Sequence, residues 1–248
     1  MTVNNSFQNS PESAALIVAA GSSVRFGQDK VTALVHGQPL IAYSLRAFAK
    51  TRSIAAIILV VSSGREEEFQ QIVQSLSKEI PTLKERIKIV VGGNSRHQSV
   101  QRGVAALPPF IRFVAIHDGA RPLITPTLIE SVLSEAYHHG AAALALPVTD
   151  TLHRVDADGC VEETVDRKKL WAVQTPQVFR VVDLINGLTL TGMQHESGFE
   201  KNPPTDEVSA LLQHGIKVHL LENMEPNMKV TYPADLTIVE AYLKSKRN

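Results

Sequence analysis

Short apolar segments that alternate with stretches of helical spacing are the feature that most constrains how this chain can fold. The first, residues 14–20, is a continuous apolar run that stops at Gly21, which is typical of a strand buried on both faces of a sheet. Further strands are expected at residues 54–61, 87–91, 113–116, 141–146 and 216–221. Helices are expected at residues 39–50, 65–78, 95–106, 126–139, 181–190, 206–214 and 234–244. Because strands that alternate with helices form right-handed βαβ units, the pattern predicts an α/β fold with a Rossmann-like, mainly parallel sheet flanked by helices.

This alternation is interrupted at about residues 147–171. Two short strands, 151–155 and 160–165, surround a D-A-D-G sequence. Its last two residues, Asp158 and Gly159, can supply the positive φ that a hairpin turn requires. We therefore predict a β-arm that projects from the sheet in this interval.

Composition limits the classes of function. The chain of 248 residues has 25 basic and 25 acidic side chains, so there is no basic excess for binding nucleic acid or a membrane surface. No apolar run approaches the ~20 residues of a membrane span, and the N-terminus lacks the pattern of a secretory signal. Cys160 is the single cysteine, which excludes an internal disulfide and favours a reducing, cytoplasmic location. We expect one domain with a full core at residues 13–248, and a flexible tail at the polar residues 1–12.

The segment after the first strand is a candidate ligand site, because open α/β sheets bind ligands at the carboxyl ends of their strands. Ala19, Ala20 and Gly21 are small enough for backbone N–H groups to approach a phosphate closely. Arg25 and Lys30 add positive charge. The spacing matches neither a Walker loop nor G-x-G-x-x-G. A tight turn with two solvated cations is the alternative interpretation.

Later motifs make the function more specific. The opening A-A-G-x-x-x-R, with a lysine a few residues on, resembles nucleotidyltransferases that build nucleoside-diphosphate sugars and alcohols. The set that follows is G-G-N-S-R-H-Q-S-V at 92–100, H-D-G-A-R-P at 117–122, D-T at 150–151, D-R-K-K-L-W at 166–171, T-P-Q-V-F at 175–179, T-D-E at 205–207 and N-M-K-V-T at 227–231. In this order, over about residues 14–244, the motifs resemble the 2-C-methyl-D-erythritol 4-phosphate cytidylyltransferase family.

The resemblance implies a reaction of CTP with methylerythritol phosphate that yields the CDP-alcohol and pyrophosphate, in non-mevalonate isoprenoid precursor synthesis. A phosphomonoester is already anionic near neutral pH, so no strong general base is required. Positioning and cations would carry most of the catalysis. Mg²⁺ is the expected cofactor, held mainly by the CTP phosphates rather than by a metal site of the protein.

The resemblance also implies roles for individual residues. The catalytic candidates, placed near the CTP phosphates, are Arg25, Lys30 and Lys229. The nucleotide-binding candidates are Ala19, Ala20, Gly21, Gly93, Asn94, Ser99 and Asp118. The acceptor-binding candidates are Arg121, Thr151, Arg167, Thr175 and Thr205. Turn, cap or surface positions are the alternatives for many of them. The histidines, including His138 and His139, show no metal spacing with a third ligand and are assigned to the surface or to packing.

In the family, an arm like the one predicted here reaches into a second subunit, where its arginine binds the acceptor phosphate. An exposed two-stranded ribbon is only marginally stable by itself. We therefore expect a homodimer with arm exchange, in which Thr151 and Arg167 serve the partner's site.

Three alternatives remain. Gly119 replaces a common alanine, as also in ribitol-5-phosphate cytidylyltransferases, which perform the same chemistry on another polyol phosphate. The spacing of Asp29 and Lys30 suggests a molybdopterin-type cytidylyltransferase, which does not account for the arm. A catalytically inactive nucleotide-binding regulator is the third, and retention of the cations Arg25, Arg167 and Lys229 speaks against it.

Overall fold

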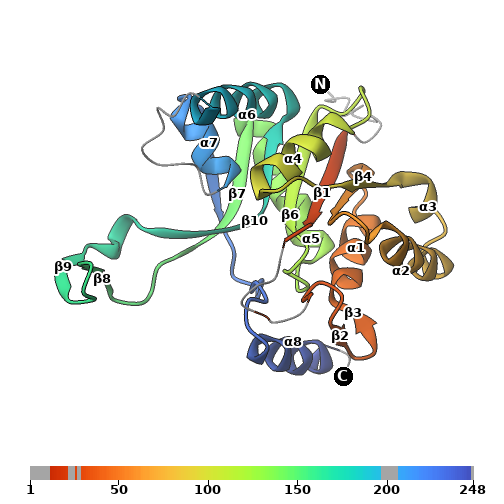
Figure 1. The fold of residues 1–248 in the computed structure, drawn as a ribbon, viewed down its shortest axis with the longest axis horizontal. Coiled ribbons are helices and arrows are strands. Elements are labelled where there is room, and N and C mark those ends of the chain that lie inside the picture. The colour runs from red at the N-terminus through yellow and green to blue at the C-terminus, as the bar shows by residue number, and fades with distance from the viewer. Residues whose placement is uncertain (1–11, 22–25, 27–28, 197–205, 247–248) are drawn as a thin grey trace, which may run out of the picture.

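The computed structural model describes residues 12–21, 26, 29–196 and 206–246. Among these residues, seven strands form one sheet in the spatial order β11 (His219–Glu222), β7 (Ala141–Pro147), β10 (Trp171–Arg180), β6 (Phe113–Asp118), β1 (Ser13–Ala19), β4 (Ile54–Val61) and β5 (Ile87–Val91) (Figure 1). Strand β10 runs antiparallel to both of its neighbours, while the other neighbouring pairs are parallel. The α/β fold with a mainly parallel sheet is thereby confirmed. The tail expected at residues 1–12 lies almost entirely outside the described residues.

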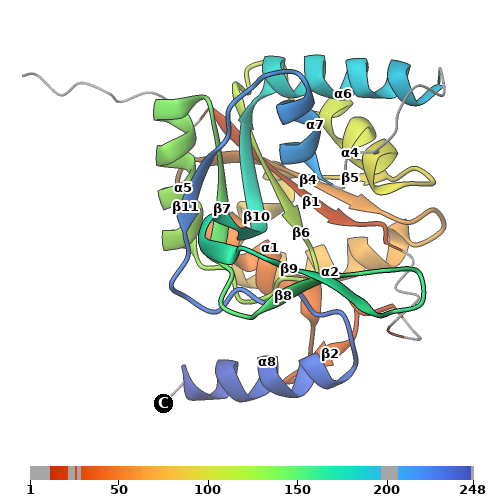
Figure 2. The ribbon, with the colours of Figure 1, turned by 90° about the vertical axis from the view of Figure 1, so that its left-hand side faces the viewer.

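Helices cover both faces of the sheet. They are α1 (Leu40–Lys50), α2 (Glu66–Glu79), α3 (Leu83–Arg86), α4 (Arg96–Ala105), α5 (Pro126–His139), α6 (Val181–Glu196) and α7 (Glu207–Gln213). A further helix, α8 (Ala234–Ser245), lies away from the sheet (Figure 1). Successive side chains of a strand point to opposite faces. Accordingly Ala15 and Ile17 of β1 pack with α1, α2 and α5, whereas Leu16 packs with α4, α6 and α7. Figure 2 shows the sheet between α5 on one side and α4, α6 and α7 on the other.

Local sequence explains how these helices begin and how closely they pack. Helix α5 starts with Pro126 at its first turn, and the Thr125 hydroxyl accepts a hydrogen bond from the Leu128 N–H at 3.2 Å. Helix α4 lies tightly against β1 at Gly103, where an added Cβ would be 2.7 Å from the Leu16 Cδ1. This close approach packs the last turn of α4 against the middle of β1.

Strand β10 was not foreseen from the sequence. Its ten residues include Pro176 and the polar Gln174 and Gln177, so they lack the continuous apolar pattern of the parallel strands. Its pairing with β7 shifts register between Val173 and Gln177, which accommodates the irregular segment. By entering the sheet between β6 and β7, it brings Thr175 beside the end of β6.

Strands β8 (Leu152–Val155) and β9 (Val161–Val165) pair with each other as an antiparallel two-stranded sheet. Figure 1 shows this ribbon away from the central sheet. At its turn the Asp156 carboxylate accepts hydrogen bonds from the N–H groups of Asp158 and Cys160, and Gly159 has φ of 82°. The side chains of Val155 and Val161 are exposed.

The remaining elements lie beside α8. Strands β2 (Leu34–Val35) and β3 (Gln38–Pro39) form a short hairpin, and Val239 of α8 packs in a cluster with Val35 and Leu40. Within the part of the chain that is described, no helix has the combination of length and apolarity that a membrane span requires.

Candidate active site

A cleft opens where β1 and β6 end and where the loop before α4 begins. Its lining residues are Val18, Ala19, Ala20, Gly21, Lys30, Val31, Gly93, Asn94, Ser95, Arg96, Ser99, Asp118, Ala120 and Lys229. They come from five separate stretches of the chain. The structure therefore brings together the described candidates for nucleotide binding and two of the three catalytic candidates.

Asp118 lies at the centre of a cluster of cations. Its carboxylate oxygens lie 2.8 Å from the Lys229 Nζ and 3.4 Å from the Arg96 Nη2. The Arg121 Nε is 3.8 Å away. Burial alone would raise the pKa of Asp118, but these positive charges outweigh burial and hold the pKa well below its ordinary range. The carboxylate is therefore ionised at neutral pH and can orient the cations around it.

The loop before α4 forms the opposite wall. Ser95 caps the helix by accepting a hydrogen bond from the Gln98 N–H at 3.1 Å. The Ser99 hydroxyl accepts a hydrogen bond from the Gly93 N–H at 3.1 Å and donates to the Ser95 carbonyl at 2.8 Å. A Cβ at Gly93 would lie 2.4 Å from the Gln98 Cβ, so only glycine fits this turn. These bonds fix the backbone groups of the loop at the edge of the cleft.

A chain of hydrogen bonds supports the end of β6 from below. The Asp118 N–H donates to the Thr175 hydroxyl oxygen at 3.1 Å. Since the His117 Nε2 donates to the Arg121 carbonyl at 3.1 Å, its Nδ1 accepts from the Thr175 hydroxyl, also at 3.1 Å. Burial lowers the pKa of His117 to about 4, so the ring is neutral and suits this network.

The segment that carries Lys229 is anchored on both sides. The Asn227 side chain is buried and donates to the Thr175 carbonyl at 2.8 Å and to the Gln174 Oε1 at 3.2 Å. The Val230 N–H donates to the Ala120 carbonyl at 2.8 Å. Lys229 is held between these two anchors, with its ammonium group on Asp118.

The comparisons with known proteins agree with this geometry. The sequence profile of the 2-C-methyl-D-erythritol 4-phosphate cytidylyltransferase family matches residues 13–245. The chain belongs to this family.

Individual relatives cover nearly all of the chain. The 2-C-methyl-D-erythritol 4-phosphate cytidylyltransferase of Synechococcus elongatus is 38% identical over 235 residues, which is 94% of this chain and 96% of that protein. The bifunctional enzyme IspD/IspF of Desulfotalea psychrophila is 40% identical over 94% of this chain, and the match spans 57% of that longer protein. The crystal structure of 2-C-methyl-D-erythritol 4-phosphate cytidylyltransferase from Thermus thermophilus matches this chain with a TM-score of 0.72 at 28% identity. The match covers 93% of this chain and 98% of the Thermus thermophilus chain.

In this family member, Arg96 and Glu207 are site residues that the sequence interpretation did not assign. The Arg96 Nη1 contacts the buried Glu207 carboxylate at 2.6 Å and thereby links α7 to Asp118. Burial raises the pKa of Glu207. Burial would lower the pKa of Arg96, but the neighbouring carboxylates outweigh it and raise the pKa. Arg96 lies in the motif at 92–100 and Glu207 in the motif at 205–207, so the sequence did mark both positions. Their pairing was not visible because it joins distant segments.

Other candidates lie elsewhere. The partly buried Arg121 lies beside Asp118 and donates to the Asn227 carbonyl at 2.8 Å, and it is not among the described residues that line the cleft. Thr175 is buried in the network below Asp118. Thr151 and Arg167 are exposed at the base of the ribbon, where the Arg167 Nη1 donates to the Thr149 carbonyl at 2.6 Å. Arg25 and Thr205 lie outside the described residues. The roles suggested for all of these residues stay predictions.

Proposed function

We propose that this protein transfers the cytidylyl group of CTP to the phosphate of 2-C-methyl-D-erythritol 4-phosphate. A phosphate oxygen of the acceptor forms a bond to the α-phosphorus of CTP, and the bond from that phosphorus to the bridging oxygen of pyrophosphate breaks. The products are the CDP-alcohol and pyrophosphate. The acceptor oxygen is already anionic, so this reaction needs no proton transfer to begin.

The observation that carries the proposal is the cluster of cations around Asp118, next to the glycine loop at residues 92–99. Two polyanions must approach each other, and negative charge grows on the leaving oxygens. Lys229 and Arg96 both line the cleft and are oriented by the same ionised carboxylate. Such preorganised charges stabilise a transition state without reorganising during the reaction.

Nucleotide recognition is proposed for the opposite wall of the cleft. Gly93 and Asn94 present backbone groups there, and Ser99 lines the same wall. The backbone C=O groups of this loop can accept a hydrogen bond from the exocyclic amine of cytosine, since the N–H groups of Gly93 and Asn94 already donate to Ser99 and Gln98. The small residues Ala19 to Gly21 leave room for the triphosphate beside Lys30.

Mg²⁺ is the proposed cofactor. Asp118 provides the one carboxylate among the described residues that line the cleft. This donor set suits Mg²⁺, which is often bound by one or two carboxylates together with substrate phosphates and water. When bound, the ion would neutralise charge on the triphosphate.

We further propose a homodimer in which each ribbon contributes Arg167 to the partner's acceptor site. The exposed Val155 and Val161 on a two-stranded ribbon support this, because an isolated ribbon is marginally stable and gains from packing on another surface. A reducing, cytoplasmic location is proposed because the one cysteine of the chain, Cys160, is exposed as a free thiol.

The decisive experiment measures phosphate after pyrophosphatase treatment, with CTP, Mg²⁺ and a panel of polyol phosphates. We expect turnover with 2-C-methyl-D-erythritol 4-phosphate, and background release when the acceptor is omitted. Turnover of ribitol 5-phosphate alone would assign the other acceptor. Binding of CTP with no pyrophosphate release under any acceptor would instead indicate an inactive nucleotide-binding regulator.

A further inference from the structure

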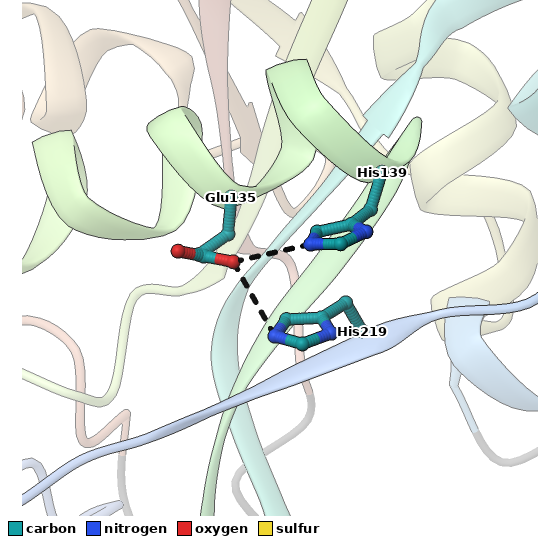
Figure 3. Close-up of side chains that lie close together, drawn as sticks. All are labelled: Glu135, His139 and His219. Carbon is teal, nitrogen blue, oxygen red and sulfur yellow. Dashed lines mark ion pairs between the residues drawn. The ribbon is translucent and has the colours of Figure 1, made fainter.

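Three side chains gather on the surface at the edge of the sheet that is occupied by β11. Figure 3 shows the carboxylate of Glu135 facing the imidazoles of His139 and His219. One potential ligand atom from each residue lies within 4.8 Å of the others. The sequence interpretation assigned the histidines to the surface or to packing because the sequence showed no metal spacing with a third ligand. That ligand comes from β11, far along the chain.

The spacing of these atoms is informative. The Glu135 Oε2 is 3.5 Å from the His139 Nε2 and 3.3 Å from the His219 Nε2. A charge-assisted hydrogen bond is normally shorter, at about 2.7–2.9 Å. Around a tetrahedral zinc ion with bonds of about 2.0–2.1 Å, neighbouring ligand atoms are about 3.4 Å apart. Both measured separations are close to this value.

The fold supplies these ligands from two packed elements. Glu135 and His139 are four residues apart on α5 and therefore lie on one face of the helix. His219 is the first residue of β11, and its ring stacks on that of His139 with centroids 4.2 Å apart and an angle of 12° between the planes. Both imidazoles thus lie beside the carboxylate, and one ring turns about its side-chain torsions on binding, because a metal ion lies in the plane of each imidazole that coordinates it.

We propose that Glu135, His139 and His219 form a binding site for one divalent transition-metal ion of the zinc class. Two imidazole nitrogens and one carboxylate oxygen are ligands that suit Zn²⁺, whereas Mg²⁺ and Ca²⁺ prefer oxygen alone. A fourth position is open to water, since all three side chains are at least one third exposed.

The site is separate from the proposed cytidylyl transfer. It lies at the amino ends of β7 and β11, because His139 precedes β7 and His219 opens β11, while the cleft lies at the carboxyl ends of β1 and β6. A bound ion would link the short edge strand β11 to α5. Its expected effect is therefore on stability rather than on turnover.

The test uses untagged, full-length protein that has been stripped with a chelator, dialysed, and titrated with Zn²⁺ alone by calorimetry. The variants are His139→Ala and His219→Ala. His138→Ala is the matched control, because His138 is an exposed neighbour on the same helix that is not part of the cluster. Thermal unfolding with and without Zn²⁺ provides a second readout.

We expect each cluster variant to bind one equivalent of Zn²⁺ fewer than wild type, and the control to bind the wild-type amount. When the free Zn²⁺ concentration is ~100 times Kd, the Tm of wild type and of the control should rise by roughly 5 °C. The Tm of the cluster variants should rise by less. Wild-type stoichiometry and Tm response in either cluster variant would overturn the proposal. These results are independent of whether the protein turns over CTP.

Discussion

Two segments carry a cation that the proposed reaction uses, and they are held in very different ways. Lys229 lies on a segment whose neighbour Asn227 is buried and makes two side-chain hydrogen bonds to β10. Arg167, in the 3-10 turn η2 (Arg167–Lys169) after β9, is exposed and makes one hydrogen bond to the Thr149 carbonyl.

The difference shows which of these two charges a single chain can hold in place by itself. A charge must be fixed in the folded protein to stabilise a transition state strongly. Lys229 meets this requirement within the chain, since it is also paired with Asp118 at 2.8 Å. Arg167 would meet it only when another surface holds the ribbon. The comparison therefore predicts that removal of Lys229 lowers kcat, whereas removal of Arg167 weakens binding of the acceptor.

The largest expected effect is that of Lys229→Ala. Loss of one preorganised charge should lower kcat by roughly 10²–10³-fold with the fold intact. Steady-state kinetics with saturating CTP and acceptor measure it, and circular dichroism checks the fold. Lys244→Ala, on the exposed surface of α8, is the control and should retain full activity. An unchanged kcat in Lys229→Ala would remove this residue from the mechanism.

The free energy of unfolding should decrease in acid, because the buried His117 below Asp118 is held neutral in the folded protein. The pKa of His117 is about 4 in the folded protein, against an ordinary value of 6.5. Between these values the unfolded chain binds more protons, so the contribution of this group is complete above pH 6.5 and is lost as the pH falls toward 4. The loss is roughly 3 kcal/mol in the free energy of unfolding.

Urea denaturation of wild type and His117→Gln at pH 6.5 and pH 4.5 measures this contribution. The variant starts from lower stability but should show a weaker dependence on pH. The exposed His138→Gln should keep the wild-type dependence. Equal pH dependence in wild type and His117→Gln would show that the histidine is not held neutral.

For Arg167→Ala we expect a rise in the KM for the acceptor of roughly 10-fold or more, with a smaller change in kcat, because one charge-assisted contact to a phosphate is lost. Initial rates across a range of acceptor concentrations measure it. Lys169→Ala, two residues away and also exposed, is the matched control.

Mixed subunits test whether the site is shared. When Arg167→Ala and Lys229→Ala proteins are unfolded and refolded together, half of the dimers should be mixed, with one complete site each. Activity at low acceptor concentration should then recover to about a quarter of wild type. If the mixture is no more active than the two variants measured separately, arm exchange is wrong.

The smallest expected effect is that of Asn227→Ala. Removing its buried hydrogen bonds should lower the free energy of unfolding by about 1–3 kcal/mol. It should also lower kcat several-fold through looser positioning of Lys229, with less change in the KM for CTP. Asn186→Ala, on the exposed face of α6, is the control. A loss of stability with unchanged kcat would limit Asn227 to a structural role.

Much of the fold could be predicted from local pattern. The expected bounds of β4, β5 and α5 match those observed, because runs of β-branched residues and apolar residues at helical spacing report burial directly. Strand β10 was not predicted, because it contains polar residues and a register shift in its pairing with β7. These features are accommodated by contacts that form only in the assembled sheet. The motifs also indicated most of the residues that line the cleft.

The sequence by itself therefore determined the alternation of elements, the family, and which residue types are available near the ends of the strands. The tertiary structure decided which of them meet. Arg96 contacts Glu207, Thr175 supports Asp118, and His219 joins α5. These contacts connect segments that are distant along the chain, and their distances depend on how strands and helices pack in three dimensions. Local periodicity carries no information about that packing.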